Sequence, residues 1–254
     1  MTETLQLRGR FAGVNLDELV DARVVRTWLY WGMFWLMVTP SVGVTISGLF
    51  NYPDYLGTTQ LGLTFGRLRP IHVNGVIMGA FSALFIGECY YLVPRLCGVR
   101  VPWQQLGVPL AWVWNLALMA GLIGLGFGLN HGLEAGELPL YSEIPIFIAA
   151  ALATAQFLTT IARRLESPLY VALWYLIGAF VWTTMNLILG SFILPYTISG
   201  INSAGFHGLY IHYIVGLWIT PAGYVIIYYY LPLSVRNPLY AHKLSLIHIS
   251  EPTR

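Results

Sequence analysis

Six long apolar runs dominate this sequence of 254 residues. The hydrocarbon core of a bilayer is about 30 Å thick, and about 20 helical residues cross it. The six runs, each of about that length, are residues 28–50, 71–93, 106–129, 144–161, 169–194 and 208–231. Because 57% of all residues are hydrophobic and only 9% are charged, the composition excludes an ordinary soluble domain. The sequence therefore predicts an all-α, polytopic membrane helix bundle with six transmembrane helices.

The overall charge and the cysteines exclude several other classes of protein. The formal net charge of +2 is too small to indicate a nucleic-acid partner. Cys89 and Cys97 form no CxxC pair and suggest no disulfide framework. No short apolar core with a cleavage site opens the chain, so we expect the first span to remain as a membrane anchor.

The basic residues in the connecting segments predict the orientation in the membrane, since such residues collect on the cytoplasmic side. Ten of them fall on one face of the predicted bundle, whereas Arg67 and Arg69 fall on the other. We expect a multi-pass protein of a bacterial or archaeal plasma (inner) membrane with a cytoplasmic N-terminus and with loops 51–70, 130–143 and 195–207 outside. The ten residues are Arg8, Arg10, Arg23, Arg26, Arg95, Arg100, Arg163, Arg164, Arg236 and Lys243.

Two histidines are the main candidates for chemistry. His72 lies at the start of the second span and His212 about one turn into the sixth. Ionisable side chains inside a membrane usually mark a cofactor, an ion path or a proton relay, and neutral imidazole is a common ligand of haem iron and copper. A hydrogen-bonded structural role is the alternative for a buried histidine. Both spans start on the outer face, so the two imidazoles share the outer third of the membrane at similar depth.

Charged residues of both signs collect outside the two histidines. Arg67 and Arg69 precede His72, and Glu134 and Glu137 occupy the next outer loop. Guanidinium groups pair well with carboxylates. The two arginines could therefore bind the carboxylates of an anionic cofactor, or they could form ordinary salt bridges at the membrane interface.

The remaining histidines are weaker ligand candidates. His207 lies five residues before His212 and so faces about 140° away on a helix. We expect it to be interfacial, and we expect His131 and His242 to occupy loops where they are solvated.

Four motifs stand at the ends of the second and sixth spans. They are Gly-Arg-Leu-Arg-Pro-Ile-His at 66–72, Tyr-Tyr-Leu-Val-Pro at 90–94, Tyr-Ile-His-Tyr-Ile-Val-Gly at 210–216 and Tyr-Tyr-Tyr-Leu-Pro at 228–232. Together they resemble the motifs of the catalytic subunit I of haem-copper oxygen reductases. The resemblance covers nearly the whole chain. It implies that His72 is an axial ligand of the low-spin haem iron and that His212 binds the active-site copper. It also implies that the arginines and glutamates named above lie in the region of the haem propionates.

The subtype resembled most is the cbb-type cytochrome c oxidase. Gly216 stands one turn after His212, where mitochondrial-like oxidases carry Tyr and nitric oxide reductases carry Glu. The segment Gly-Leu-Glu-Ala-Gly-Glu-Leu-Pro at 132–139 resembles that subtype's acidic loop, although Tyr213 replaces an Asn usual in the family. The implied cofactors are a low-spin haem b, a high-spin haem and copper, with calcium near Glu134 and Glu137.

A complete subunit of this family has about twelve helices, and its seventh and tenth helices supply the remaining ligands. We expect residues 1–243 to be the N-terminal half of such a subunit. The tail 244–254, Leu-Ser-Leu-Ile-His-Ile-Ser-Glu-Pro-Thr-Arg, matches a translated sequencing adaptor, which excludes His248 as a ligand. Residues 244–248 also resemble the start of the family's seventh helix, whereas 250–254 do not.

The resemblance implies a fragment of a terminal respiratory oxidase. The whole enzyme would reduce oxygen to water with electrons from cytochrome c subunits or soluble cytochrome c, and would translocate protons. We expect the fragment to be inactive alone, because the other metal ligands are missing. The alternatives are a nitric oxide reductase of the same superfamily that lacks Glu at position 216, a six-helix membrane transporter that uses His72 and His212 as proton relays, and a simple membrane cytochrome.

Overall fold

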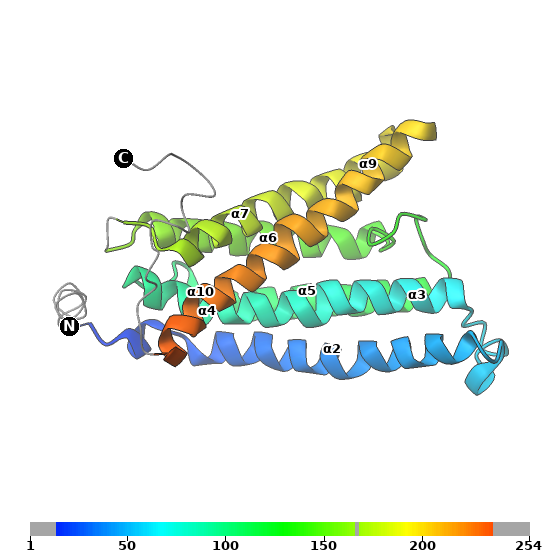
Figure 1. Ribbon diagram of the computed structural model, residues 1–254, viewed down its shortest axis with the longest axis horizontal. Helices are drawn as coiled ribbons and strands as arrows, with labels where there is room; N and C mark the ends of the chain where they lie inside the picture. Colours follow the sequence, from blue (N-terminus) through cyan, green and yellow to red (C-terminus); the bar gives the residue numbers. More distant parts are fainter. Residues whose placement is uncertain (1–13, 166–167, 236–254) are drawn as a thin grey trace.

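The computed structural model describes residues 14–165 and 168–235 and forms a bundle of six long helical spans (Figure 1). Each span is long and apolar enough to cross a membrane, and the described residues contain no strand. This confirms the predicted all-α bundle. The spans are Ala22–Leu49, Phe65–Cys97, Gln104–Gly126, Leu140–Ala162, Val171–Thr197 and Gly200–Val235.

Three of the six spans are continuous α-helices apart from one short 3₁₀ turn. The first is α2 (Ala22–Leu49). The third is α5 (Gly107–Gly126), preceded by the 3₁₀ turn η4 (Gln104–Leu106). The fourth is α6 (Leu140–Ala162). Two further 3₁₀ turns lie outside the spans, η1 (Leu16–Leu19) and η2 (Tyr55–Gly57).

The second, fifth and sixth spans each contain a π-helical segment. The second span comprises α3 (Phe65–Asn74), the π segment η3 (Gly75–Phe81) and α4 (Ser82–Cys97). The fifth comprises α7 (Val171–Leu187), η5 (Ile188–Ile193) and α8 (Leu194–Thr197). The sixth comprises α9 (Gly200–Tyr213), η6 (Ile214–Ile219) and α10 (Thr220–Val235). Such segments are rare and frequently occur at functional sites.

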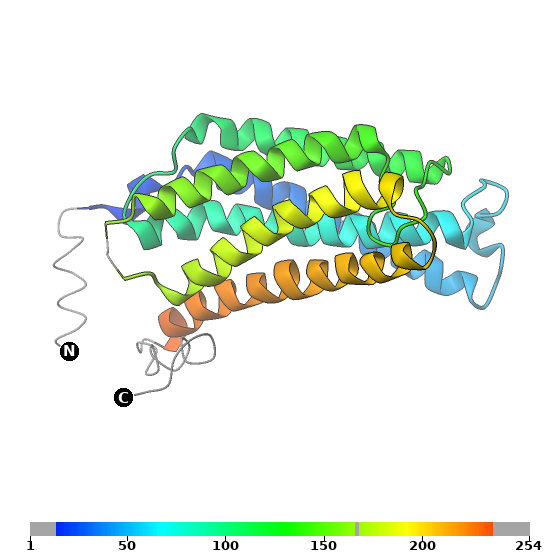
Figure 2. The same cartoon turned by 90° about the horizontal axis from the view of Figure 1, so that it is seen from above.

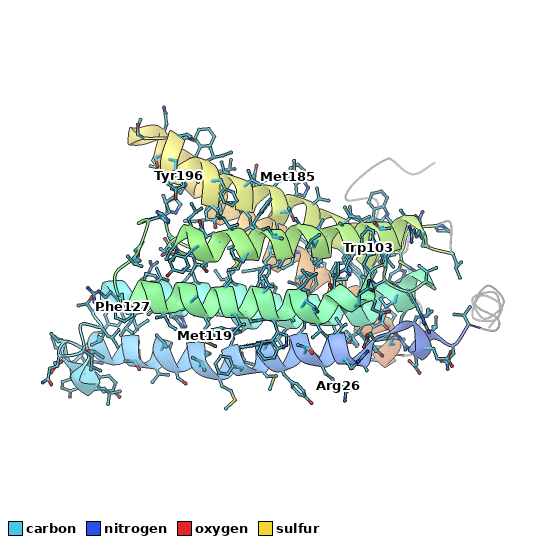
Figure 3. All side chains as sticks on the ribbon, turned by 180° about the vertical axis from the view of Figure 1, so that it is seen from behind. Arg26, Trp103, Met119, Phe127, Met185 and Tyr196 are labelled. Atoms are coloured by element: carbon cyan, nitrogen blue, oxygen red, sulfur yellow. The ribbon has the colours of Figure 1, made fainter. Side chains whose placement is uncertain are left out.

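The spans lie side by side (Figures 1 and 2), and in the view of Figure 1 the sixth runs obliquely across the others. The first span packs on the second and third, the third on the fourth, and the fifth on the fourth and sixth. The described chain begins and ends at one end of the bundle, the terminal end. The opposite end carries the 127–139 loop and is called the acidic end, after Glu134 and Glu137. Figure 3 shows this polarity, with Arg26 and Trp103 toward the terminal end and Phe127 and Tyr196 toward the acidic end.

Side chains bond to two main-chain carbonyl groups of the π segment η3. In η3, the Ile77 carbonyl accepts a 2.7 Å hydrogen bond from the Ser82 hydroxyl, and the Met78 carbonyl accepts one of 2.8 Å from the Trp114 indole. Trp218 of η6 donates 2.9 Å to the same Ser82 hydroxyl. Because an unpaired backbone group inside a membrane is costly, these bonds stabilise the second span and join it to the third and sixth.

Three spans start six or more residues before their predicted positions, the first at Ala22 rather than at 28. The second starts at Phe65 rather than at 71, and the sixth starts at Gly200 rather than at 208. Most of the residues predicted as loop 195–207 are therefore helical, and Arg67 and Arg69 lie inside α3. Apolar runs underestimate a helix because its backbone hydrogen bonds continue into the interfacial layer, where polar side chains are tolerated.

Most of the basic residues that predict the orientation can be located. Arg23 and Arg26 lie in the first turns of α2, Arg95 and Arg100 at the end of α4, and Arg163 and Arg164 at the end of α6. These six share the terminal end of the bundle. Arg8, Arg10, Arg236 and Lys243 lie outside the described residues.

Candidate metal centre

His72 lies in α3, three residues before the π segment η3 begins. Its Nδ1 lies 2.8 Å from the main-chain carbonyl oxygen of Thr39 in α2. A carbonyl can only accept, so Nδ1 carries the proton and donates it. With Nδ1 engaged in this way, Nε2 is the ring nitrogen left to bind a metal. Metal-binding histidines almost always hold their second nitrogen in such a bond, which fixes the tautomer and the orientation of the ring.

Gly43 provides the space that the His72 ring occupies. A Cβ atom built on Gly43 would lie 2.7 Å from Cε1 and 3.0 Å from Nδ1 of His72, closer than atoms can approach. Only glycine allows the ring to lie against α2 in this position. The sequence does not reveal this role, because small residues in spans usually serve helix packing.

His212 lies in α9, one residue before its end and two residues before the π segment η6 begins. It is exposed in the bundle of six spans, and no hydrogen bond to its ring is found within residues 14–165 and 168–235. A Cβ atom on Gly216 would lie 3.6 Å from Nε2 of His212, an ordinary contact distance. The ring is thus free to bind a metal ion on the exposed side of α9, which is called the open side of the bundle.

Both histidines lie at least seven residues inside their membrane spans rather than at the ends of the spans. His72 is seven residues after Phe65, and His212 is twelve residues after Gly200. The contact between Ser82 and Trp218 relates their depths, since His72 precedes Ser82 by ten residues and His212 precedes Trp218 by six. At 1.5 Å per residue, His72 lies about 6 Å nearer the acidic end, measured along the helices.

The acidic loop is bound to the helix that carries His72. Arg69 of α3 forms an ion pair with Glu134. Asn74, two residues after His72, donates a 2.7 Å hydrogen bond from Nδ2 to Oε2 of Glu137. The same Nδ2 donates 3.0 Å to the carbonyl oxygen of Pro70. The loop thus holds α3 on either side of His72.

The same loop is bound to the helix that carries His212. The Glu134 carbonyl oxygen lies 3.1 Å from Nε2 of His207, so this nitrogen donates to it. The Tyr210 hydroxyl donates 2.9 Å to the carbonyl oxygen of Ala135. His207 is therefore partly buried in α9 and bonded to the acidic loop. The four contacts make residues 134–137 a bridge between the two histidine-bearing helices.

The two glutamates of the loop have different environments. Glu134 is partly exposed, whereas Glu137 is only 3% exposed. Burial raises the pKa of the Glu137 carboxyl group above its ordinary value, and the hydrogen bond from Asn74 opposes part of this shift. Glu137 is thus a buried acid within the loop.

Arg67 makes contacts that the sequence does not predict. Its Nη1 donates 3.0 Å to the Gly62 carbonyl and 3.2 Å to the Gly126 carbonyl at the end of α5. A cation at a helix C-terminus satisfies free carbonyl groups and interacts favourably with the helix dipole. Arg67 therefore ties the loop before α3 to the third span.

The other predicted histidines lie away from these contacts or outside the described residues. His131 is in the loop after α5, as predicted, and its ring lies 5.9 Å from the Tyr196 ring. His242 and His248 fall outside the described part of the chain. Within that part, no group of three or more His, Cys, Asp or Glu side chains is placed to hold a metal ion.

Sequence reasoning missed several residues of this region. Asn74 and Tyr210 carry the bridge, and the Thr39 carbonyl orients His72. Asn74 offered a signal, as a polar residue in an apolar span two positions from a candidate ligand. The carbonyl of Thr39 offered none, since any residue type has one.

Comparison with known proteins extends these observations. The model of the family described as cytochrome c and quinol oxidase polypeptide I matches residues 23–250. A cytochrome c oxidase subunit 1 homolog of Agrobacterium tumefaciens is 30% identical over 241 residues, which are 91% of this chain and 43% of that protein. The cbb3-type cytochrome c oxidase subunit CcoN1 of Stutzerimonas stutzeri is 29% identical over 234 residues, 89% of this chain and 49% of that protein.

A third relative agrees with these two. Cytochrome c oxidase subunit 1 of Rhodobacter capsulatus is 29% identical over 245 residues, 91% of this chain and 46% of that protein. The chain thus spans less than half the length of each of these three relatives. With six membrane-length helices and a family match over most of its residues, this multi-pass membrane protein belongs to the cytochrome c and quinol oxidase polypeptide I family.

Proposed function

We propose that this chain is the N-terminal half of the catalytic subunit of a terminal respiratory oxidase. The complete enzyme takes electrons from cytochrome c subunits or soluble cytochrome c, reduces oxygen to water and couples this reaction to proton translocation. The proposal extends to this chain what the names of its relatives say of those proteins, including a cbb3-type cytochrome c oxidase subunit.

The observation that carries the proposal is the state of the His72 ring. Its Nδ1 is bonded to the Thr39 carbonyl, which leaves Nε2 as the nitrogen available to a metal, and Gly43 provides the space for the ring. This is the arrangement that an axial ligand of haem iron requires. A proton relay has no need for a ring fixed in one tautomer by a carbonyl, which makes the transporter the weaker alternative.

His212 fits the role of one copper ligand. Its ring is exposed on the open side of the bundle, where ligands from other helices can join it, and Gly216 leaves space beside Nε2. Gly216 also disfavours those nitric oxide reductases that carry a glutamate at this position, but not a form that lacks it. When bound, the low-spin haem b would transfer electrons, and the high-spin haem with copper would bind and reduce oxygen.

The acidic loop would position the two ligand helices. Through Asn74 and Tyr210, it holds residues two positions from each histidine. We propose that Arg69 and Glu134, with Arg67 and Glu137, set the electrostatics around the haem propionates and a nearby calcium ion. The acidic end would then face the outside, where electrons arrive, and the N-terminus would be cytoplasmic.

In this proposal, residues 1–243 belong to the oxidase and residues 244–254 are a translated adaptor. Low-spin haem takes two axial ligands, and the copper of this family takes three histidines. His72 and His212 supply one ligand to each site. The 254-residue chain would therefore not reduce oxygen without the remaining half of the subunit.

The test uses the complete subunit, read from the source gene beyond residue 243. We expect His72→Ala to abolish the low-spin haem signal in reduced-minus-oxidised spectra. We expect His212→Ala to remove copper and oxygen reduction while leaving the low-spin signal. His131→Ala is the matched control, because this loop histidine contacts the Tyr196 ring and neither candidate site.

Three results would contradict the proposal. A complete subunit with activity but without haem would favour a transporter. Iron in place of copper in metal analysis would favour a nitric oxide reductase. A His72→Ala variant with an unchanged low-spin spectrum would remove the assigned ligand.

A further inference from the structure

A buried acid near the acidic end takes no part in the contacts described above. Glu143 lies in the first turn of α6, inside the fourth span, and is only 6% exposed. Ionisable groups inside a membrane are expensive to bury and usually functional. The structure shows what surrounds this one.

Glu143 lines a small cavity to which four spans and the acidic loop contribute. The polar side chains beside Glu143 in this lining are Ser191 in the π segment η5 and Tyr210 in α9, and the loop contributes Ala135. The rest of the lining is apolar, with Met78 and Leu187 among it. The space open to the centre of a water molecule is ≈ 10 Å³, at the size that a single ordered water requires.

One carboxylate oxygen in this region lacks a partner. Oε2 of Glu143 is buried and has no hydrogen-bond partner among the described residues. The Ser191 side chain is a hydrogen-bonding neighbour of the same carboxyl group. An unsatisfied buried polar atom costs about 1–3 kcal/mol, and ordered water commonly satisfies such atoms.

No ion pair of Glu143 is found within residues 14–165 and 168–235. The ion pairs found in the described residues are Arg23 with Asp21, Arg69 with Glu134, and Arg95 with Asp17. The titratable neighbours on this side are Tyr210 and, beyond it, Glu137, and both carboxyl groups act electrostatically on the Tyr210 hydroxyl. A carboxylate buried among uncharged and acidic groups is far less stable than the neutral acid.

We propose that Glu143, Ser191 and one bound water form a proton-holding site, with Glu143 present as the neutral carboxylic acid. The acid O–H donates to the water, which fills the cavity beneath Tyr210. Release of the proton passes it to this water and leaves the carboxylate. A role of this site in catalytic turnover rests on the proposed oxidase function. Tyr210 would link the site to that function, because it lies two residues before His212 and contacts the acidic loop. The existence of the site does not rest on that function.

The experiment is infrared difference spectroscopy between H₂O and D₂O on the purified chain and on the complete subunit at neutral pH. A protonated carboxyl group gives a C=O stretching band that shifts on deuteration. We expect one such band to disappear in Glu143→Gln and to move in Ser191→Ala. Glu88→Gln is the matched control, because Glu88 is also intramembrane but is bonded to the Tyr230 hydroxyl and partly exposed. The Glu143 band should remain in that variant.

The outcomes separate this proposal from the proposed function. A spectrum unchanged by Glu143→Gln would overturn the site, whatever the subunit does. If Glu143→Gln fails to fold, Glu143→Asp provides the second test, since it should keep a protonated carboxyl band at a shifted frequency. The band together with a haem-free complete subunit would support the site and contradict the oxidase. With haem present, we expect Glu143→Gln to slow proton uptake during oxygen reduction at least tenfold.

Discussion

The Asn74 amide donates a 2.7 Å hydrogen bond to the Glu137 carboxyl group, and both side chains are buried. This bond joins the helix that carries His72 to the loop that also holds the helix carrying His212. The two candidate ligands are more than one hundred residues apart in the chain. Their relative position therefore depends on a loop that contains neither of them.

Asn74→Ala should lower stability by about 1–2 kcal/mol, because it leaves the buried Glu137 oxygen without its donor. In the complete subunit, it should also broaden or shift the low-spin haem band. Thermal unfolding in detergent and visible spectra check these effects. Asn51→Ala, at an exposed position, is the control and should change neither. Equal behaviour of the two variants would contradict the role of the bridge.

Gly43→Ala should displace the His72 ring, because the new Cβ would lie 2.7 Å from Cε1. We expect low-spin haem occupancy to fall about tenfold, as when an orienting contact of a metal ligand is removed. Gly208→Ala is the control, since no atom lies within 4 Å of its Cβ. That change should leave the spectrum intact and slightly stabilise α9. Normal haem content in Gly43→Ala would show that His72 does not need this space.

Ser82→Ala should destabilise the contact between the second and sixth spans. It removes the donor to the Ile77 carbonyl and the acceptor of the Trp218 indole. We expect a loss of about 1–2 kcal/mol. Ser41→Ala removes a similar hydroxyl that bonds to the Met37 carbonyl on an exposed face, so its effect should be smaller. Thermal unfolding in detergent checks this, and the apparent Tm of Ser82→Ala should be lower than that of Ser41→Ala. The reverse order would contradict the prediction.

Glu137 should make stability depend on pH. Its pKa is higher in the folded chain than in the unfolded chain, because burial disfavours the charged form. The folded state therefore holds a proton that the unfolded state releases. The resulting stabilisation is complete below the unfolded pKa and is lost as pH rises through the folded pKa. As pH rises above the ordinary glutamate pKa of about 4.3, apparent Tm should fall less steeply in Glu137→Gln than in the parent. Equal slopes would contradict this assignment.

The sequence predicts some elements of this region better than others. The existence of all six spans follows from apolar runs, because a bilayer requires about 20 apolar helical residues. Their ends do not follow, since Arg67, Arg69 and His207 continue helices beyond the apolar runs. The π segments also escape prediction. Their stability depends on side chains from other spans, such as the Trp114 indole on the Met78 carbonyl.

The sequence alone determined the class of fold, the candidate ligands His72 and His212, and the resemblance to subunit I of the haem-copper oxygen reductases. These follow from hydrophobicity and from local motifs, which need no knowledge of distant contacts. The tertiary structure decided the tautomer of His72, the space at Gly43, the bridge through Asn74 and Tyr210, and the cavity beside Glu143. Each of these depends on atoms that lie far apart in the chain and meet only when the helices pack.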